Sequence, residues 1–178
     1  SSADFYADNI NFNENGFGMF DLYINGKYAE HFELSVVGKH NISNSLAAIC
    51  VAYAQKVDIN AIKKGLLSFR GADRRFQKKG VINGITVIDD YAHHPSEINA
   101  TLEAAKNYPH NRIVCVFQPH TYTRTKNFLK DFARSLSKAD MVIVTDIYAA
   151  REKDTGEISS KDLYNELKRR NAEVYYIS

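Results

Sequence analysis

The sequence predicts an α/β fold, in which a mostly parallel sheet with helices on both faces follows a region of β-hairpin and helices. From residue 85 onward, strand-like and helix-like segments alternate regularly, which is typical of a parallel sheet. The first 37 residues instead show short β-rich pieces broken by turns. With 178 residues and 44% hydrophobic side chains, the chain can bury the core of one ordinary domain or parts of two.

The first β-rich region is expected to form a hairpin, and a helix is expected to follow it. Asn25-Gly26 separates two β-rich runs, and this dipeptide is a strong hairpin signal. Apolar residues then recur at helical spacing as far as Gln55, with Ser43 or Asn44 as the N-cap.

A second helix and a polar linker precede the alternating region. Asp58 is expected to cap that helix, and the polar residues 70–75 after it are typical of a domain linker. The remaining elements are expected to be the strands Ile85–Asp89, Arg112–Phe117, Met141–Thr145 and Glu173–Ile177 and the helices Glu97–Lys106, Lys126–Leu136 and Lys161–Arg170.

Charge and hydropathy indicate neither a nucleic-acid nor a membrane partner. Lys and Arg number 23 against 21 Asp and Glu, without a long run of one sign. No apolar run approaches the roughly 20 residues of a spanning helix, and residues 1–8 lack the features of a signal peptide. We therefore expect a soluble, cytoplasmic protein. Cys50 and Cys115 lie in apolar patterns and are expected to be buried thiols.

The segments that follow three of the expected strands are rich in polar side chains. In open α/β sheets the ligand lies beyond the carboxyl ends of the strands, so residues 89–95, 118–124 and 146–151 are expected to meet along one edge. Their acids, histidines and arginines could hold anions, a metal or a proton-transfer group. Alternatively, His93 and His94 could act as a helix cap, and Arg124 could be a solvated surface charge.

Neither a zinc centre nor a phosphate loop is expected in this chain. The adjacent pair His93-His94 lacks the spacing that puts two imidazoles on one helix face, and no cysteine pair supports zinc. Magnesium carried in with phosphates is more plausible, because it needs only one or two protein oxygens. The pattern Gly-x-x-x-x-Gly-Lys-Ser/Thr is absent, so a nucleotide is held without it or the loop lies in a part of the protein not present here.

Four segments together resemble the successive signatures of the Mur ligases in order and spacing. These segments are Gly38–Asn44, Arg74-Arg75-Phe76, Asp89–Pro95 and Phe117–Thr125. The last one is similar to the loop of the alanine-adding member rather than to that of murein peptide ligase, although position 121 is Thr where some alanine-adding members have Arg. The resemblance covers nearly the whole chain.

This resemblance implies a domain organisation and a reaction. Residues 1–73 would be the end of the central ATP-binding domain, and residues 74–178 would be the C-terminal Rossmann-like domain without its last elements. The front of the enzyme, with its phosphate loop, would be missing, and the chain alone would be inactive. The implied enzyme uses ATP and Mg2+ to join L-alanine to the lactyl carboxylate of UDP-N-acetylmuramate through an acyl phosphate. The alternatives are a sibling such as murein peptide ligase and a non-catalytic nucleotide-binding module.

The resemblance also implies roles for individual residues. The nucleotide would be contacted by His40, Asn41, Asn44, Arg75, Asp90 and Tyr91. The amino-acid substrate would be contacted by His120, Arg124 and Tyr91, with the Arg124 guanidinium pairing with the alanine carboxylate. His93 and Arg75 would be catalytic, and no residue is expected to ligate a metal directly. Asp146, Tyr148 and Arg151 resemble family positions without an assigned role.

Overall fold

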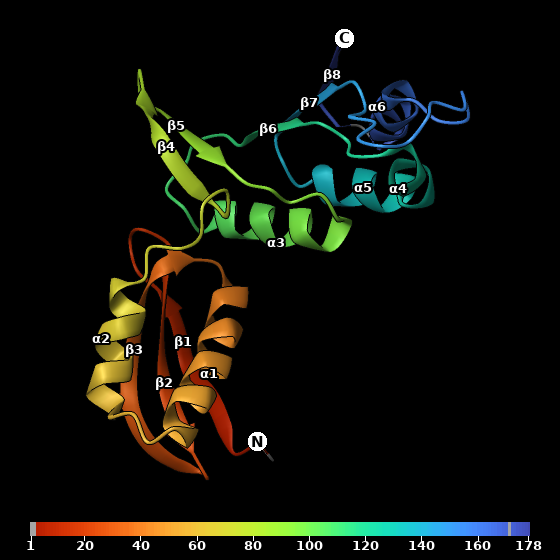
Figure 1. The fold of residues 1–178 in the computed structure, drawn as a ribbon. Coiled ribbons are helices and arrows are strands. Elements are labelled where there is room, and N and C mark those ends of the chain that lie inside the picture. The colour runs from red at the N-terminus through yellow and green to blue at the C-terminus, as the bar shows by residue number, and fades with distance from the viewer. Residues whose placement is uncertain (1–2, 171) are drawn as a thin grey trace. The chain divides into compact units, whose positions relative to one another are not determined.

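The computed structural model describes residues 3–170 and 172–178, and the chain divides into two compact units. The first unit runs to Asp90 and includes Asn107–Pro109, and the second comprises Tyr91–Lys106 and His110–Ser178. Both contain strands and helices, so the expected α/β class is confirmed (Figure 1). The domain boundary expected after Asp73 stays a prediction.

The first unit contains an antiparallel sheet that packs against two helices (Figure 1). The elements of this unit are β1 (Phe5–Phe12), β2 (Phe17–Ile24), β3 (Lys27–Val37), α1 (Lys39–Ala54), α2 (Ile59–Ser68), β4 (Gln77–Ile82) and β5 (Ile85–Asp89). The sheet has the strand order β1-β2-β3, and β4 and β5 form a separate pair. Phe20 and Leu22 alternate along β2 and therefore point to the same face of the sheet. There they join Ile49 of α1 and Ile62 of α2 in one buried cluster, which forms the core of this unit.

Two tight hairpins belong to the first unit. Asn25 and Gly26 both have positive φ, 49° and 77°, and connect β2 to β3, as predicted. Asn83 and Gly84 repeat this geometry, with φ of 50° and 80°, between β4 and β5. This second hairpin was not predicted, although its Asn-Gly signal is the same. The strand predicted at Ile85–Asp89 is present, but it pairs antiparallel with β4, so its assignment to the parallel sheet was wrong.

The starts of the two helices differ in how well the sequence predicted them. Asp58 caps α2 as expected, because its Oδ1 accepts the backbone N–H groups of Asn60 and Ala61 at 2.9 and 3.2 Å. Helix α1 begins at Lys39, immediately after Gly38 with φ of 94°, and no side chain caps it. The prediction of Ser43 or Asn44 as its N-cap was therefore wrong.

The second unit contains a parallel sheet of strand order β6-β7-β8. Its elements are α3 (Pro95–Lys106), β6 (Val114–Phe117), α4 (Tyr122–Asn127), α5 (Leu129–Leu136), β7 (Met141–Thr145), α6 (Ser160–Arg169) and β8 (Val174–Ile177). The helix predicted over residues 126–136 is thus two helices that meet at Phe128.

One face of the parallel sheet forms the core of the second unit. Val142 and Val144 of β7 are fully buried there with Phe132 of α5 and Leu163 of α6. The opposite face includes exposed apolar side chains such as Val116, which is 66% exposed. Among the described residues, the expected layer of helices is therefore present on one face and not on both.

Two further expectations concern cysteine burial and the membrane. Cys115 is half-buried and packs against the core, whereas Cys50 is exposed on α1, so the prediction that both thiols are buried was wrong for Cys50. In the part of the chain that the structure describes, no helix combines the length and the hydropathy that a membrane crossing requires.

Candidate functional site

In the second unit, the loops that follow β6 and β7 are joined through their backbones. The N–H of Thr121 donates to the carbonyl oxygen of Tyr148 at 2.9 Å, and the N–H of Tyr148 donates to that of Pro119 at 2.8 Å. His120 and Tyr148 consequently form a short parallel bridge. These two loops meet at the carboxyl ends of neighbouring parallel strands, as the sequence predicted.

The segment before α3 adds two aromatic side chains to these loops. The ring of His120 lies 5.4 Å from that of Tyr148 and 6.1 Å from that of His93, measured between centroids. His93 in turn lies 5.1 Å from the ring of Tyr91. The structure thus brings together three predicted site residues, Tyr91, His93 and His120, and adds Tyr148, for which no role was predicted.

Arg124 joins this cluster from the first turn of α4. One of its terminal nitrogens lies 3.1 Å from Nδ1 of His120 and 3.4 Å from the carbonyl oxygen of the same residue. A guanidinium only donates hydrogen bonds, so Nδ1 of His120 accepts and its proton lies on Nε2. Because Arg124 is half-buried and held at His120, the interpretation of it as a freely solvated charge does not describe this arrangement.

The two adjacent histidines have different environments. Nδ1 of His93 lies 2.8 Å from the carbonyl oxygen of Tyr91, which can only accept, so Nδ1 carries the proton and Nε2 is the acceptor of the neutral ring. His94 instead caps α3, because its Nδ1 lies 2.8 Å from Oγ of Ser96 and 3.3 Å from its backbone nitrogen. The cap interpretation therefore fits His94, and the site interpretation fits His93.

Glu97, for which no role was predicted, fixes this segment. Its Oε2 accepts the backbone N–H groups of His93 and His94 at 3.0 and 3.1 Å and lies 3.5 Å from Nδ1 of His93. A Glu in the first turn that reaches back to the residues before the helix is typical of a capping box. The spacing of Glu97 from the start of α3 was the signal that could have identified it.

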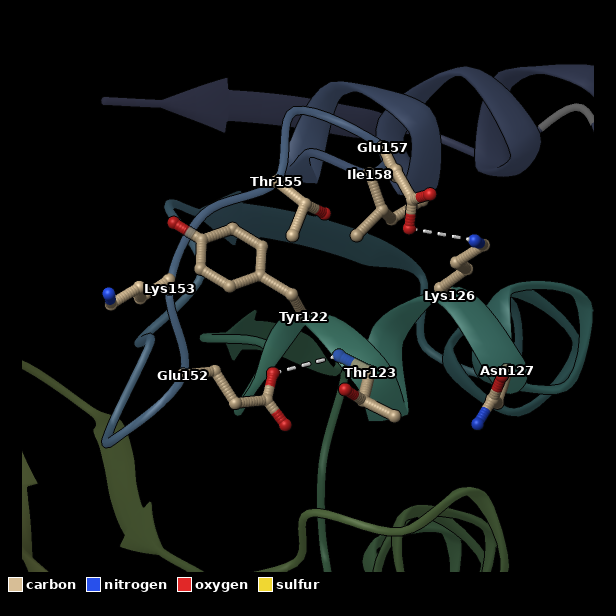
Figure 2. A pocket seen from close by; sticks show the side chains of 9 residues that line it. All are labelled: Tyr122, Thr123, Lys126, Asn127, Glu152, Lys153, Thr155, Glu157 and Ile158. Atoms are coloured by element: carbon tan, nitrogen blue, oxygen red, sulfur yellow. Dashed lines mark hydrogen bonds and ion pairs between the residues drawn. The ribbon is translucent and has the colours of Figure 1, made fainter.

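A cavity of about 420 Å³ lies between α4 and the loop after β7 (Figure 2). The ion pair of Lys126 and Glu157, at 2.9 Å, and the hydrogen bond from the Thr123 N–H to Glu152, also at 2.9 Å, form part of its wall. None of the predicted site residues lines it, although Thr123 precedes Arg124. Its lining residues are Tyr122, Thr123, Lys126, Asn127, Glu152, Lys153, Thr155, Glu157 and Ile158.

In the first unit, three of the predicted nucleotide residues lie at the start of α1. Nδ2 of Asn41 donates to the carbonyl oxygen of Val37 at 2.8 Å, and Nδ2 of Asn44 donates to Oδ1 of Asn41 at 3.0 Å. Although His40 is exposed, partial desolvation of its ring lowers its pKa, and the negative charge of Asp90 opposes this shift. His40 is therefore neutral at pH 7 and can both donate and accept.

Asp90 and Arg75 lie at the ends of the segment that includes β4 and β5. Oδ2 of Asp90 accepts the backbone N–H of Phe76 at 2.8 Å. Phe76 and Arg74 have positive φ, 48° and 56°, and Arg74 also lies 3.4 Å from Asp89. Asp90 thus holds the turn that carries Arg75, whose side chain is exposed.

The predicted residues are distributed unevenly over the two units. His40, Asn41, Asn44, Arg75 and Asp90 belong to the first unit, and Tyr91, His93, His120 and Arg124 belong to the second. Within the described part of the chain, no group of three or more His, Cys, Asp or Glu side chains is placed to hold a metal ion.

A family model, related sequences and solved structures all indicate the same protein family. Residues 74–178, more than half of the chain, match the model of the Mur ligase glutamate ligase domain. The UDP-N-acetylmuramate–L-alanine ligase of Caldanaerobacter subterraneus subsp. tengcongensis is 55% identical over 175 residues, which are 98% of this chain and 38% of that protein.

Two solved structures are also similar. The crystal structure of UDP-N-acetylmuramate–alanine ligase from Thermotoga maritima has a TM-score of 0.82 at 31% identity and covers 98% of this chain and 37% of its own. That of the murein peptide ligase from Psychrobacter arcticus has a TM-score of 0.66 at 26% identity, covering 99% of this chain and 36% of its own.

Proposed function

The chain belongs to the Mur ligase family, and from this premise we propose that the protein containing it is an ATP-dependent ligase of peptidoglycan precursor synthesis. Its reaction joins L-alanine to the lactyl carboxylate of UDP-N-acetylmuramate through an acyl phosphate. The chain spans only 38% of the length of its Caldanaerobacter relative. Because it lacks the phosphate-loop pattern, we expect the chain alone to be inactive.

The cluster of His93, His120 and Arg124 is the observation that carries this proposal. The Arg124 guanidinium has five N–H donors, and those that do not contact His120 can pair with the carboxylate of alanine. The Nε2–H of His120 adds a neutral donor beside it. A fixed guanidinium and a neutral donor suit a small amino acid, whose carboxylate has to be held while its amine reacts.

His93 is suited to the proton transfer that this reaction requires. Alanine enters as an ammonium ion and attacks as a free amine, so it has to lose a proton. The Nδ1–H of His93 is held by the Tyr91 carbonyl, which leaves the Nε2 lone pair to accept this proton. His93 and His120, whose rings lie close together, thus present one acceptor, Nε2 of His93, and one donor, Nε2–H of His120.

The residues of the first unit are proposed to hold ATP. When bound with Mg2+, ATP supplies the phosphoryl group that activates the carboxylate. The amide groups of Asn41 and Asn44 and the neutral ring of His40 offer the donors and acceptors that an adenine edge needs. Asp90 can accept hydrogen bonds from ribose hydroxyls, and the exposed Arg75 can reach phosphate oxygens.

Several further properties belong to this proposal. Tyr91 is proposed to contact both the nucleotide and the amino acid, and Arg75 and His93 to be the catalytic residues of this chain. The enzyme is proposed to act in the cytoplasm, where its product serves cell-wall growth, cell shape and cell division. A sibling that adds another amino acid or a preformed peptide is the alternative, and the amine that supports turnover distinguishes the two.

The test is ADP release by the complete protein that contains this chain, with UDP-N-acetylmuramate, Mg2+ and ATP, with and without L-alanine. We expect turnover to require alanine. Arg124→Ala should raise the KM for alanine roughly 100-fold, because charge-assisted hydrogen bonds to its carboxylate are lost. Arg134→Ala is the matched control, since the side chain of Arg134 is 71% exposed and its Nη1 lies 3.4 Å from the carboxylate of Asp131 on the same helix.

The alternatives make different predictions in this assay. Turnover with a peptide and not with alanine would assign the protein to a sibling ligase. Nucleotide binding without any turnover would favour a non-catalytic module.

A further inference from the structure

Glu152 belongs to the loop after β7, yet its carboxylate contacts the helix that carries Arg124. Its Oε2 accepts the backbone N–H of Thr123, the second residue of α4, at 2.9 Å (Figure 2). The hydrogen bond from the Thr123 backbone is the main cause that lowers the pKa of Glu152, and desolvation by burial opposes it. The carboxylate is therefore charged at neutral pH and accepts a backbone donor at the start of α4.

Backbone strain on both sides of this contact shows that the local geometry is held by its neighbours. Thr121, directly before α4, has φ of 68° and ψ of 144°, and Ala150, two residues before Glu152, has φ of 54°. Residues with a β-carbon rarely adopt positive φ, and they keep it only where surrounding contacts hold it. Glu152 links the two segments that contain these residues.

Helix α4 depends on such contacts for its position. It has six residues, which is too short for a helix to be stable by itself. The Oγ1 of Thr125 donates to the carbonyl oxygen of Thr121 at 2.7 Å, and Thr125 is fully buried. Arg124 lies next to this anchored residue, so a change at the start of α4 moves the guanidinium relative to His120.

We propose that Glu152 is a positioning residue for the amino-acid pocket, because its carboxylate fixes the start of α4 and so holds the Arg124 guanidinium against His120. This inference rests on the proposed function, in which Arg124 binds the alanine carboxylate. Glu152 acts through α4 and is not itself a substrate contact.

The test is Glu152→Gln in the complete protein. Glutamine keeps the size of the side chain, but it has one acceptor oxygen in place of two and no charge. We expect the KM for L-alanine to rise roughly tenfold, with kcat and the KM for ATP within about twofold of the wild type, because the substrate contact is displaced and the nucleotide contacts are not. A role limited to overall stability would not separate these constants.

Glu157→Gln is the matched control. Glu157 lines the same cavity and receives the same substitution, but its partner, at 2.9 Å, is Nζ of the exposed Lys126 side chain near the end of α4, and not a backbone group at the start of the helix. All three kinetic constants should stay at wild-type values in this variant. An equal rise of the KM for alanine in both variants would assign the effect to the charge of the cavity and overturn the positioning role.

The remaining outcomes separate this inference from the proposed function. If wild-type turnover does not require alanine, the proposed function fails. If it does, and Glu152→Gln leaves the KM for alanine unchanged, only the positioning role fails. Should the thermal transition of Glu152→Gln fall below the assay temperature, Glu152→Asp decides, because it keeps the charge on a shorter side chain. An unchanged KM for alanine in that variant also overturns the inference.

Discussion

The proposed amino-acid residues of the second unit come from separate segments and contact one another, whereas the hydrogen bonds described for the proposed nucleotide residues of the first unit lie within a helix start or within one hairpin segment. His93, His120 and Arg124 form one connected cluster, joined by ring contacts and a 3.1 Å contact. In the first unit, Asn41 is held by the carbonyl of Val37, and Asp90 holds the N–H of Phe76. The amino-acid pocket is therefore formed where loops from different strands meet. The nucleotide residues instead lie on a helix start and on a hairpin segment, each with its own hydrogen bonds.

Topology explains this difference. Parallel strands β6 and β7 end at the same edge, so the loops after them exchange backbone hydrogen bonds and their side chains converge. The nucleotide residues lie instead at a helix start and at the two ends of the β4–β5 segment. The hydrogen bonds of the Asn41 and Asn44 side chains join residues three or four positions apart, and that from Phe76 to Asp90 joins the two ends of the β4–β5 segment. Converging loops can preorganise a substrate contact, while locally fixed turns preorganise single residues.

The largest expected effect comes from removing the core of either unit. Phe132 in the second unit and Phe20 in the first are both fully buried, each in its own cluster. Phe132→Ala should lower the free energy of unfolding by about 3–5 kcal/mol, through lost burial and the cavity left behind. Native-state hydrogen exchange should show this loss at the amides of β7 and α5, and Phe20→Ala should show it at those of β2 and β3.

These two substitutions control for each other. Phe132→Ala could lower the amide exchange protection of both units equally. The two cores would then unfold as one cooperative element, and the units would not differ in stability.

The sequence predicted best those features that depend on a few adjacent residues. The Asn25-Gly26 turn requires positive φ at both positions, and the Asp58 cap requires one short acceptor before a helix, so each is readable from its own segment. The α/β class followed from the alternation of strands and helices. The meeting of the loops that carry His120 and Tyr148 followed from where two neighbouring parallel strands end.

The missed features depend on contacts between distant segments or on pairing choice. Glu152 meets Thr123 across 29 positions of sequence, and nothing in the residues around either one indicates the other. Strand β5 was assigned to the parallel sheet because a short apolar run does not specify its partner. Its Asn83-Gly84 turn was the only local sign of pairing with β4.

The next expected effect uses the one cysteine that each unit contains. Cys50 is exposed on α1, whereas burial raises the pKa of the Cys115 thiol to about 11. The thiolate is the reactive form, and a rise from 9.0 to about 11 reduces it roughly 100-fold at neutral pH. Iodoacetamide should therefore label Cys50 at least 100-fold faster than Cys115, measured by mass spectrometry of peptides.

Cys50→Ser provides the control for this comparison. The variant should take up almost no label when folded and one label in urea, where Cys115 regains the pKa of an exposed thiol. Equal labelling of both cysteines in the folded protein would show that the β6 strand opens readily and would contradict the buried position of Cys115.

The smallest expected effect tests whether the first unit serves the nucleotide separately from the amino acid. Asp90→Asn keeps an acceptor oxygen for the Phe76 N–H but removes the charge. Since hydrogen bonds to a charged acceptor are about twice as strong as neutral ones, we expect the KM for ATP to rise roughly tenfold. The KM for alanine should not change, which is the reverse of the result expected for Arg124→Ala.

Asp58→Asn is the matched control for this last substitution, because Asn caps a helix as well as Asp does and both KM values should stay constant. A second measurement is independent of turnover. The charge of Asp90 raises the pKa of His40 against the effect of desolvation, so Asp90→Asn should lower that pKa in an NMR titration of the histidine rings. A fall in the pKa of His40 would show that the charge of Asp90 acts on His40. If in the same variant the KM for alanine rises and the KM for ATP does not, Asp90 contributes to amino-acid binding, and the proposed separation of nucleotide residues from amino-acid residues is wrong.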